Sequence, residues 1–265
     1  MRQLSIVVAA ALSAAAPVLA QADQRDAWQR PAWRVTGGIP LTWRSASAHP
    51  ESGLGLQFRT DTPYAGLDLE GQLFPRRAFP SSALPPWAEP LGLSVSLSHR
   101  ALTSRLGAEE FGSREQRAAL DVLYEKHLPG RSTRLTGRAG WAWHRFGVDE
   151  SAVIGTVTHR GPRLGIDLVQ PLHPRVDAIG GVSVMPWAII GGEEKRARGE
   201  ASEGWGTELL LGLGGQVPQV RGLGWRVVYD YLRFSDRYAG TGVLSAGGTG
   251  AAAHHAILLG ATWQR

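Results

Sequence analysis

The sequence predicts an all-β fold: a closed antiparallel transmembrane β-barrel of about twelve strands, within a range of about ten to fourteen. Three observations lead to this prediction. An export signal begins the chain, short segments of alternating apolar and polar residues follow it, and helical periodicity is scarce. A run of about 18 apolar residues, which a membrane-spanning helix requires, does not occur after the export signal. We therefore expect strands to make up the mature chain.

The N-terminus has the three parts of a secretory signal peptide. Arg2 supplies a positive charge, residues 4–16 form an apolar stretch, and Val18-Leu19-Ala20 matches the small-residue pattern of a cleavage site. The stretch is too short to span about 30 Å of hydrocarbon comfortably, and the chain has no cysteine that could carry a lipid anchor. We expect a cleaved signal peptide over residues 1–20, an N-terminal lead-in over 21–32 and one barrel domain over 33–265.

The composition excludes several kinds of protein. With zero cysteines, the 265-residue chain cannot form a disulfide scaffold, a thiolate metal site or a cysteine nucleophile. Its formal net charge is +5, and loss of Arg2 with the signal peptide would leave 27 − 23 = +4. Lys126 and Lys195 are the only lysines, and no cluster of basic residues is interleaved with aromatics as a nucleic-acid groove requires. We therefore expect no nucleic-acid partner.

Alternation is clearest at residues 91–98, where Leu91, Leu93, Val95 and Leu97 occupy the odd positions and small or polar residues the even ones. Successive side chains of a strand point to opposite faces, so such a segment has one apolar face and one polar face. About twelve segments of this kind are predicted. They lie near residues 33–45, 51–61, 64–75, 91–100, 116–128, 133–147, 151–159, 162–172, 175–190, 203–217, 222–236 and 254–265.

The connections between these segments differ in length. Tight turns are expected at Asp61-Thr62-Pro63 and at Arg160-Gly161-Pro162, because proline and glycine favour turns. Long polar connections are expected at residues 76–90, 101–115, 191–202 and 238–253. A mixture of short turns and long loops is typical of membrane β-barrels.

The polar faces decide between a membrane barrel and a soluble sandwich. In a sandwich the apolar faces form a core, whereas in a membrane barrel they meet lipid and the polar faces line the lumen. Here the polar faces carry small and charged residues with almost no lysine. Tryptophans such as Trp33, Trp43 and Trp263 fall near segment ends, as at a membrane interface. We therefore favour the barrel, with a secreted soluble β-sandwich that binds carbohydrate or protein as an alternative.

Ten residues on the polar faces are expected to line the lumen. Most are charged, with both signs present, so they could pair across strands and plug the barrel, or set a field in a water-filled pore. These residues are Asp68, Glu70, Asp121, Glu125, Arg138, His144, Asp167, Glu208, Arg226 and Asp230.

The C-terminal segment carries a resemblance to a known class. Apolar residues occupy every second position of this segment, at Ile257, Leu259, Ala261 and Trp263. Alternation of this kind covers most of residues 33–265. In these respects the chain resembles the Gram-negative outer-membrane β-barrel proteins. That class usually ends on an aromatic residue, whereas here Gln264 and Arg265 follow the tryptophan. The resemblance implies residence in the outer membrane, with outer-membrane lipid, lipopolysaccharide and the outer-membrane assembly machinery as partners.

Known catalytic and metal-binding patterns are lacking, so we expect no catalytic residue, no metal and no cofactor. Ser98 and His99 are adjacent and would point to opposite faces of a strand, and no G-x-S-x-G motif occurs. His254 and His255 would diverge in the same way, and no H-E-x-x-H motif accompanies them. The glycines at 212–215 are not followed by the Lys-Ser/Thr of a phosphate-binding loop.

Two functions fit this prediction best, a narrow channel or a structural membrane protein. A barrel of eight strands is filled by its side chains and one of sixteen leaves a channel, so about twelve strands allow either. A second alternative is a barrel hydrolase acting on lipid A or phospholipid, for which His99 and His144 are the residues to substitute.

Signal-peptide cleavage can be checked by mass spectrometry of the protein extracted from the membrane fraction. We expect the mature chain to begin at Gln21, because residues 1–20 are removed. Ala20→Arg should slow cleavage and leave the precursor, whereas Ala20→Ser should be processed normally. A mature protein that retains Arg2 would contradict the prediction.

Overall fold

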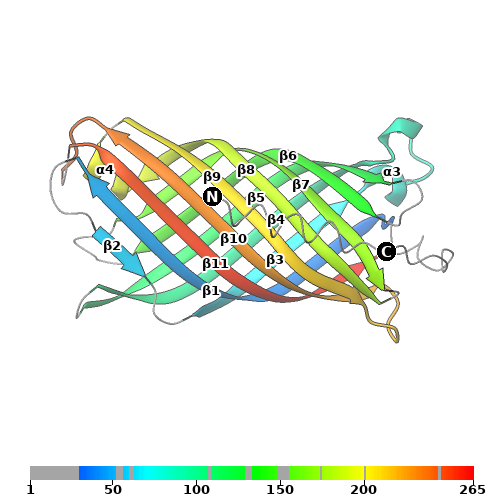
Figure 1. Ribbon diagram of the computed structural model, residues 1–265. Helices are drawn as coiled ribbons and strands as arrows, with labels where there is room; N and C mark the ends of the chain where they lie inside the picture. The colour runs from blue at the N-terminus through cyan, green and yellow to red at the C-terminus, as the bar shows by residue number, and fades with distance from the viewer. Residues whose placement is uncertain are drawn as a thin grey trace.

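The computed structural model describes residues 30–51, 56–59, 63–106, 109–128, 133–148, 155–173, 175–199, 201–243 and 246–265. The predicted signal peptide and most of the lead-in lie outside these residues. Eleven strands form one antiparallel sheet, and its first strand pairs with its last, so that the sheet closes into a barrel (Figure 1). Within the described part of the chain, no helix has the length and apolar character to cross a membrane.

The bounds of the strands are β1 (Trp33–Pro50), β2 (Leu56–Arg59), β3 (Tyr64–Leu73), β4 (Leu91–Leu106), β5 (Glu109–His127), β6 (Arg134–Val148), β7 (Val157–His173), β8 (Val176–Gly192), β9 (Ala201–Gln216), β10 (Leu223–Ala239) and β11 (Gly248–Gln264). Three short helical segments connect them: α3 (Pro75–Ala78), η1 (Pro86–Ala88) and α4 (Glu193–Arg198). We call the end where β1 begins and β11 finishes the terminal end, and the opposite end, which carries α4, the far end (Figure 1).

The barrel has ten strand positions around its circumference, so the prediction of about twelve strands is wrong by two. One reason is that β2 and β3 both pair with β1 in the same direction and share one position. The chain therefore does not reverse between them at the expected turn, of which Asp61 and Thr62 lie outside the described residues. The second reason is that β7 runs straight through Arg160-Gly161-Pro162, where a register shift against β8 replaces the expected turn.

Several connections are also shorter than predicted. Residues 101–115 belong mostly to β4 and β5, and β10 and β11 take up half of residues 238–253. Residues 76–90 do connect two strands and include η1, and residues 191–202 include α4.

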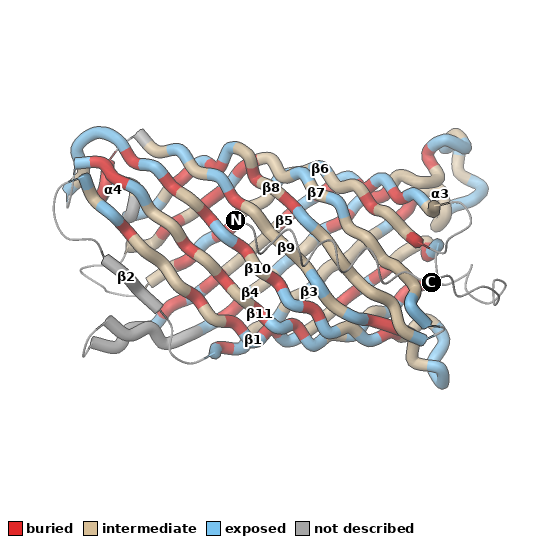
Figure 2. Tube along the Cα trace, in the orientation of Figure 1, coloured by how far each residue is buried: buried red, intermediate tan, exposed pale blue. Residues whose placement is uncertain are grey.

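The apolar face of the sheet points outward. Val95, Leu120 and Ile166 are 48%, 58% and 52% exposed, whereas Ser94 and Asp121 are each 2% exposed. Exposed and buried residues alternate in this way along the strands (Figure 2). This arrangement is the reverse of a soluble sandwich, whose apolar faces would be buried against each other, so that alternative is wrong.

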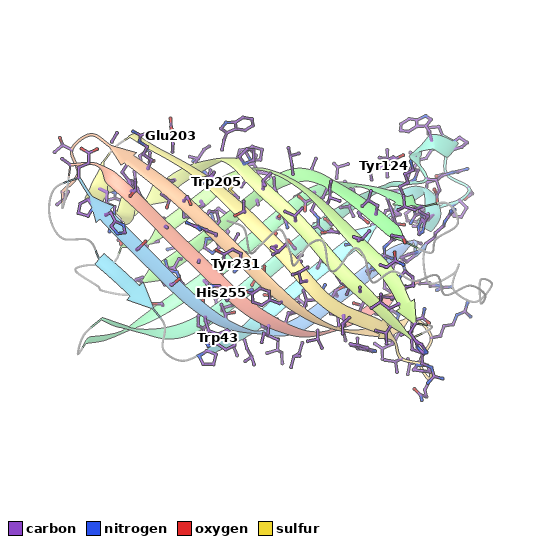
Figure 3. All side chains as sticks on the ribbon, viewed as in Figure 1. Trp43, Tyr124, Glu203, Trp205, Tyr231 and His255 are labelled. Atoms are coloured by element: carbon purple, nitrogen blue, oxygen red, sulfur yellow. The ribbon has the colours of Figure 1, made fainter. Side chains whose placement is uncertain are left out.

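Aromatic side chains lie on the outside of the barrel at two levels. Trp43, His255 and Tyr231 are register partners on β1, β11 and β10 and lie near the middle of the barrel's length, whereas Tyr124 lies near the terminal end (Figure 3). The strands continue beyond the level of Trp43: β1 runs on to Pro50, although it was predicted to end near residue 45. Trp43 therefore lies within its strand and not near the end.

Two clusters of apolar side chains lie in the far half of the lumen, beside buried polar residues such as Glu115 and Asp236. One cluster of buried residues draws on five different strands and another on β8 and β10. Gly206 makes room for the second, because a Cβ at this position would lie 2.8 Å from Phe234 Cε1. The clusters are Tyr64, Phe146, Val157, Ile190 and Tyr238, and Met185, Ala188, Leu232 and Phe234.

The outward orientation of the apolar face predicts the effect of a charge placed there. We expect Val95→Arg to destabilise the barrel in lipid vesicles by roughly 2–4 kcal/mol, the cost of an arginine near the middle of a bilayer. Urea unfolding followed by tryptophan fluorescence would measure this. Val243→Arg is the matched control, because Val243 is 86% exposed and lies outside the strands. Equal stability of the two variants would contradict a lipid-facing wall.

Candidate functional site

Nine of the ten residues predicted to line the lumen make ion pairs in the structure, and the tenth, His144, lies within hydrogen-bonding distance of Glu115. Their side chains lie on the faces opposite the exposed aliphatic residues, and their partners come from other strands or from the segment between β3 and β4. Several of these pairs join strands that are not neighbours in the sheet, such as Arg226 on β10 with Glu70 on β3. Such a contact can form only through the inside of the barrel.

One ion pair joins opposite walls. Arg117 on β5 donates from Nη1 to Asp230 Oδ2 on β10 over 2.9 Å. Following the order β1, β3, β4, β5, β6, β7, β8, β9, β10, β11 around the barrel, β5 and β10 lie half the circumference apart in either direction. The two side chains therefore span the lumen.

Two further arginines, Arg163 and Arg138, pair with acidic residues inside the barrel. Arg163 Nη2 lies 2.5 Å from Glu208 Oε2 on β9, and its Nη1 lies 3.5 Å from Asp121 Oδ2 on β5. Arg138 is hydrogen bonded to Asp167 and lies 3.7 Å from Glu70 Oε1. The charged side chains thus form a connected network and not separate pairs.

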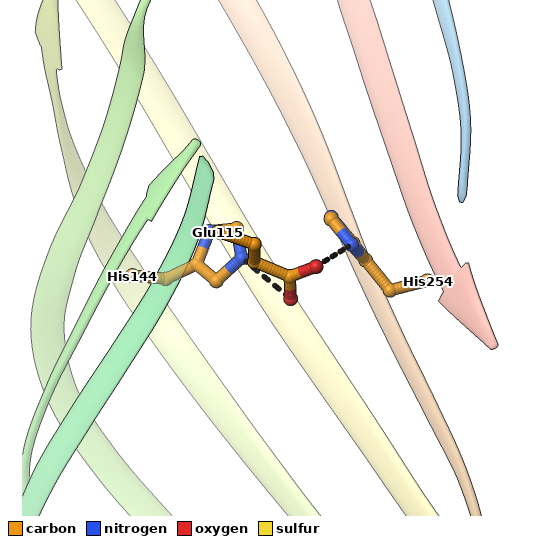
Figure 4. Close-up of side chains that lie close together, drawn as sticks. All are labelled: Glu115, His144 and His254. Atoms are coloured by element: carbon orange, nitrogen blue, oxygen red, sulfur yellow. Dashed lines mark hydrogen bonds and ion pairs between the residues drawn. The ribbon is translucent and has the colours of Figure 1, made fainter. Parts of the chain in front are cut away.

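Glu115 is the centre of a second buried group (Figure 4). The carboxylate is 0% exposed and receives donors from four other strands in addition to its own. Oε1 lies 2.7 Å from Arg117 Nε and 3.4 Å from both Arg100 Nη1 and His144 Nε2. Oε2 accepts a 2.7 Å hydrogen bond from Tyr64 OH and lies 3.2 Å from His254 Nδ1.

Charge compensation explains how this carboxylate can be buried. An unpaired charge inside a protein is strongly unfavourable, so buried charges need partners of opposite sign. Arg117 lies between Glu115 and Asp230, and Arg100 lies between Glu115 and Asp68, with Nη2 to Oδ2 at 3.2 Å. Each arginine therefore links two carboxylates.

His159 and Asp236 form a separate polar pair among the apolar side chains of the far half. His159 Nε2 on β7 lies 3.0 Å from each carboxylate oxygen of Asp236 on β10. The imidazole is stacked on Phe234, with the ring centres 4.0 Å apart, and Tyr238 OH donates to Asp236 over 3.4 Å. This pair is also fully inside the barrel.

Two cavities remain between these groups. A central cavity of about 190 Å³ is lined by His144, Arg117 and Arg100 and by the apolar Phe234. A second cavity of about 160 Å³ lies toward the terminal end, where Arg34, Gln72 and Gln264 are among its lining residues. Glu70, Arg138 and Arg226 line both cavities, and they therefore lie between them.

Several residues of these groups were missed in the sequence. Glu115 fell in a predicted connection, and Arg163 follows the proline of a predicted turn, so neither was assigned to a polar face. Arg117 could have been found, because it has the same parity as Asp121 and Glu125 in one strand.

The histidines that were singled out in the sequence have separate surroundings. Ser98 donates a hydrogen bond to Asp68 inside the barrel, whereas His99 lies on the other face beside Gln116, so they do not form a pair. His254 and His255 diverge as expected: His254 is buried, and His255 Nδ1 lies 2.7 Å from Tyr229 OH on the outside. The structure instead brings His254 together with His144 and Glu115, and one ligand atom from each lies within 4.8 Å of the others.

Comparison with known proteins identifies the fold of the chain but no protein family. No family model matches the chain, and no curated protein sequence matches it significantly. The structure of the outer membrane protease OmpT from Escherichia coli is similar at a TM-score of 0.51 and 7% sequence identity, covering 88% of this chain and 96% of that chain.

Two other structures are more distant. The outer membrane protein OprG from Pseudomonas aeruginosa gives a TM-score of 0.35 at 8% identity, covering 88% of this chain and 95% of that chain. The outer membrane protein AlkL gives a TM-score of 0.40 at 12% identity, covering 94% of each chain. The closed barrel and its similarity to the OmpT structure show that the chain has the fold of the Gram-negative outer-membrane β-barrel proteins.

Proposed function

We propose that this protein is a structural protein of the bacterial outer membrane with a closed lumen, and not an open pore. The observation that carries the proposal is the ion pair between Arg117 and Asp230, which joins opposite walls of the barrel at 2.9 Å. Phe146 and Phe234 narrow the lumen further in the far half, where Arg44 lies 3.5 Å over the Phe146 ring and His159 is stacked on Phe234.

The outside of the barrel supports a place in a membrane that contains anionic lipid. Aliphatic side chains cover the wall, and the exposed arginines Arg145, Arg160 and Arg233 lie on strands at positions nearer the far end. Guanidinium groups bind phosphate well, so these arginines suit the phosphates of lipopolysaccharide and other outer-membrane lipids. Export by the signal peptide and insertion by the outer-membrane assembly machinery belong to the same proposal.

A narrow channel that opens only under some conditions is the second candidate. The observation in its favour is the pair of cavities inside the lumen, which share Glu70, Arg138 and Arg226 as lining residues. A movement of these three side chains would join the two cavities, although the apolar far half would still have to open.

Single-channel recording in planar bilayers tests the closed lumen. We expect no conductance steps from the wild-type protein. A variant with Arg117, Asp230, Phe146 and Phe234 all changed to alanine should conduct, because the ion pair that joins opposite walls and the two rings that narrow the far half are then removed. Steady conductance steps from the wild-type protein would reject the structural role and favour the channel.

The control for these recordings is a change on the outer surface. Glu203 and Arg237 are exposed register partners on β9 and β10, with Glu203 on the outside of the barrel (Figure 3). Changing both residues to alanine should leave the protein without conductance steps. Heat-modifiable migration on gels should show for each variant that the barrel is folded.

The network around Glu115 predicts a large loss of stability when this carboxylate is removed. Glu115→Ala leaves Arg100 and Arg117 without one of their partners, and breaking a buried ion pair in this way costs roughly 3–5 kcal/mol. Urea unfolding in lipid vesicles would measure the loss. Glu203→Ala is the matched control and should change the unfolding free energy by less than about 1 kcal/mol, as for exposed charges. Similar values for the two variants would show that the network does not stabilise the barrel.

A further inference from the structure

Glu115, His144 and His254 have the composition of a transition-metal site. Imidazole nitrogen and carboxylate oxygen are ligands that zinc and related divalent metals prefer, and two histidines with one glutamate form a known ligand set for zinc. The three residues come from β5, β6 and β11, so the closed barrel alone brings them together (Figure 4). The pair His254-His255 did not suggest this site in the sequence, because the partners of His254 are distant along the chain.

The distances are close to those that a metal needs. His144 Nε2 lies 3.4 Å from Glu115 Oε1, and His254 Nδ1 lies 3.2 Å from Glu115 Oε2. Metal–ligand bonds of about 2.0–2.2 Å in a tetrahedral site place the ligand atoms roughly 3.3–3.5 Å apart. These two distances end on different oxygens of the carboxylate, and one ligand atom from each of the three residues lies within 4.8 Å of the others, so the side chains would have to draw closer to bind one ion. Each imidazole would then carry its proton on its other ring nitrogen.

The surroundings hold the carboxylate in place. Metal ligands are normally oriented by hydrogen bonds from a second layer of residues. Tyr64 OH and Arg117 Nε each lie 2.7 Å from a different oxygen of Glu115 and supply these bonds. The positive charges of Arg100 and Arg117 are opposed by Asp68 and Asp230, so they do not leave the carboxylate surrounded by unbalanced cations.

One of the three ligands, His144, lines the central cavity. His144, Arg100 and Arg117 line this cavity of about 190 Å³, so an ion inside it would reach His144 directly. Three protein ligands leave a fourth tetrahedral position for water or a small molecule, which is the arrangement of catalytic rather than structural zinc sites.

We propose that Glu115, His144 and His254 bind one divalent first-row transition-metal ion, for which Zn²⁺ is the probe, with the fourth coordination position left for water or a small molecule. This ion would also join β5, β6 and β11 across the inside of the barrel. The proposal does not depend on whether the lumen conducts, because it rests on three side chains and one cavity.

The test uses full-length mature protein that has no polyhistidine tag, is folded in detergent and has been treated with a chelator. Titration calorimetry with Zn²⁺ should give one ion bound per chain, and Co²⁺ should give the absorption spectrum of a four-coordinate ion. Glu115→Gln and His254→Asn should each abolish stoichiometric binding. Tyr64→Phe should weaken it about 10–100-fold, the usual effect of losing a second-layer hydrogen bond.

His255→Asn is the matched control, because His255 is the next residue and lies on the outside of the same strand. It should bind Zn²⁺ as the wild type does. Folded wild-type protein that binds no ion, or that binds ions only weakly and without fixed stoichiometry, would overturn the proposal and leave a hydrogen-bonded cluster. Loss of binding in His255→Asn with retention in His254→Asn would also overturn it.

Discussion

The structure depends on one constraint, that the hydrogen-bonding groups of the backbone must be satisfied within the sheet. In hydrocarbon no water can pair with a free strand edge, so a sheet that crosses a membrane has to close on itself. Here β1 pairs with β11 from Arg34 to Pro50, and this pairing removes both edges. Closure then fixes the two faces: aliphatic side chains point toward lipid, and charged side chains point into a narrow lumen.

The narrow lumen explains why the charges form a network. With ten strand positions, arginine and glutamate side chains from distant strands reach one another, and isolated charges in such an interior would be very unfavourable. Arg117, Arg138 and Arg163 each contact more than one carboxylate. The same side chains therefore fill the lumen, neutralise one another and hold the walls together.

The sequence predicted the faces of the strands better than their ends or their partners. Alternation placed Asp68 and Glu70 on a polar face because it is a local property of each strand. It failed at Pro162, where β7 stays paired with β6 and only its register with β8 shifts, so that the strand continues through a local turn signal. It also failed at Glu115, where few aliphatic residues mark the strand. The contact between Glu115 and His254 could not be predicted, because the residues are 139 positions apart and meet only through closure of the barrel.

The pairing of β1 with β11 has a consequence for folding. These two strands are far apart in the sequence, so no intermediate that lacks residues 248–264 can have all of its strand edges paired. A nascent polypeptide must therefore be kept from aggregating until β11 has been made. Loss of even this one C-terminal strand would expose β1 and β10 together, and a truncated product would be a natural target for proteolysis.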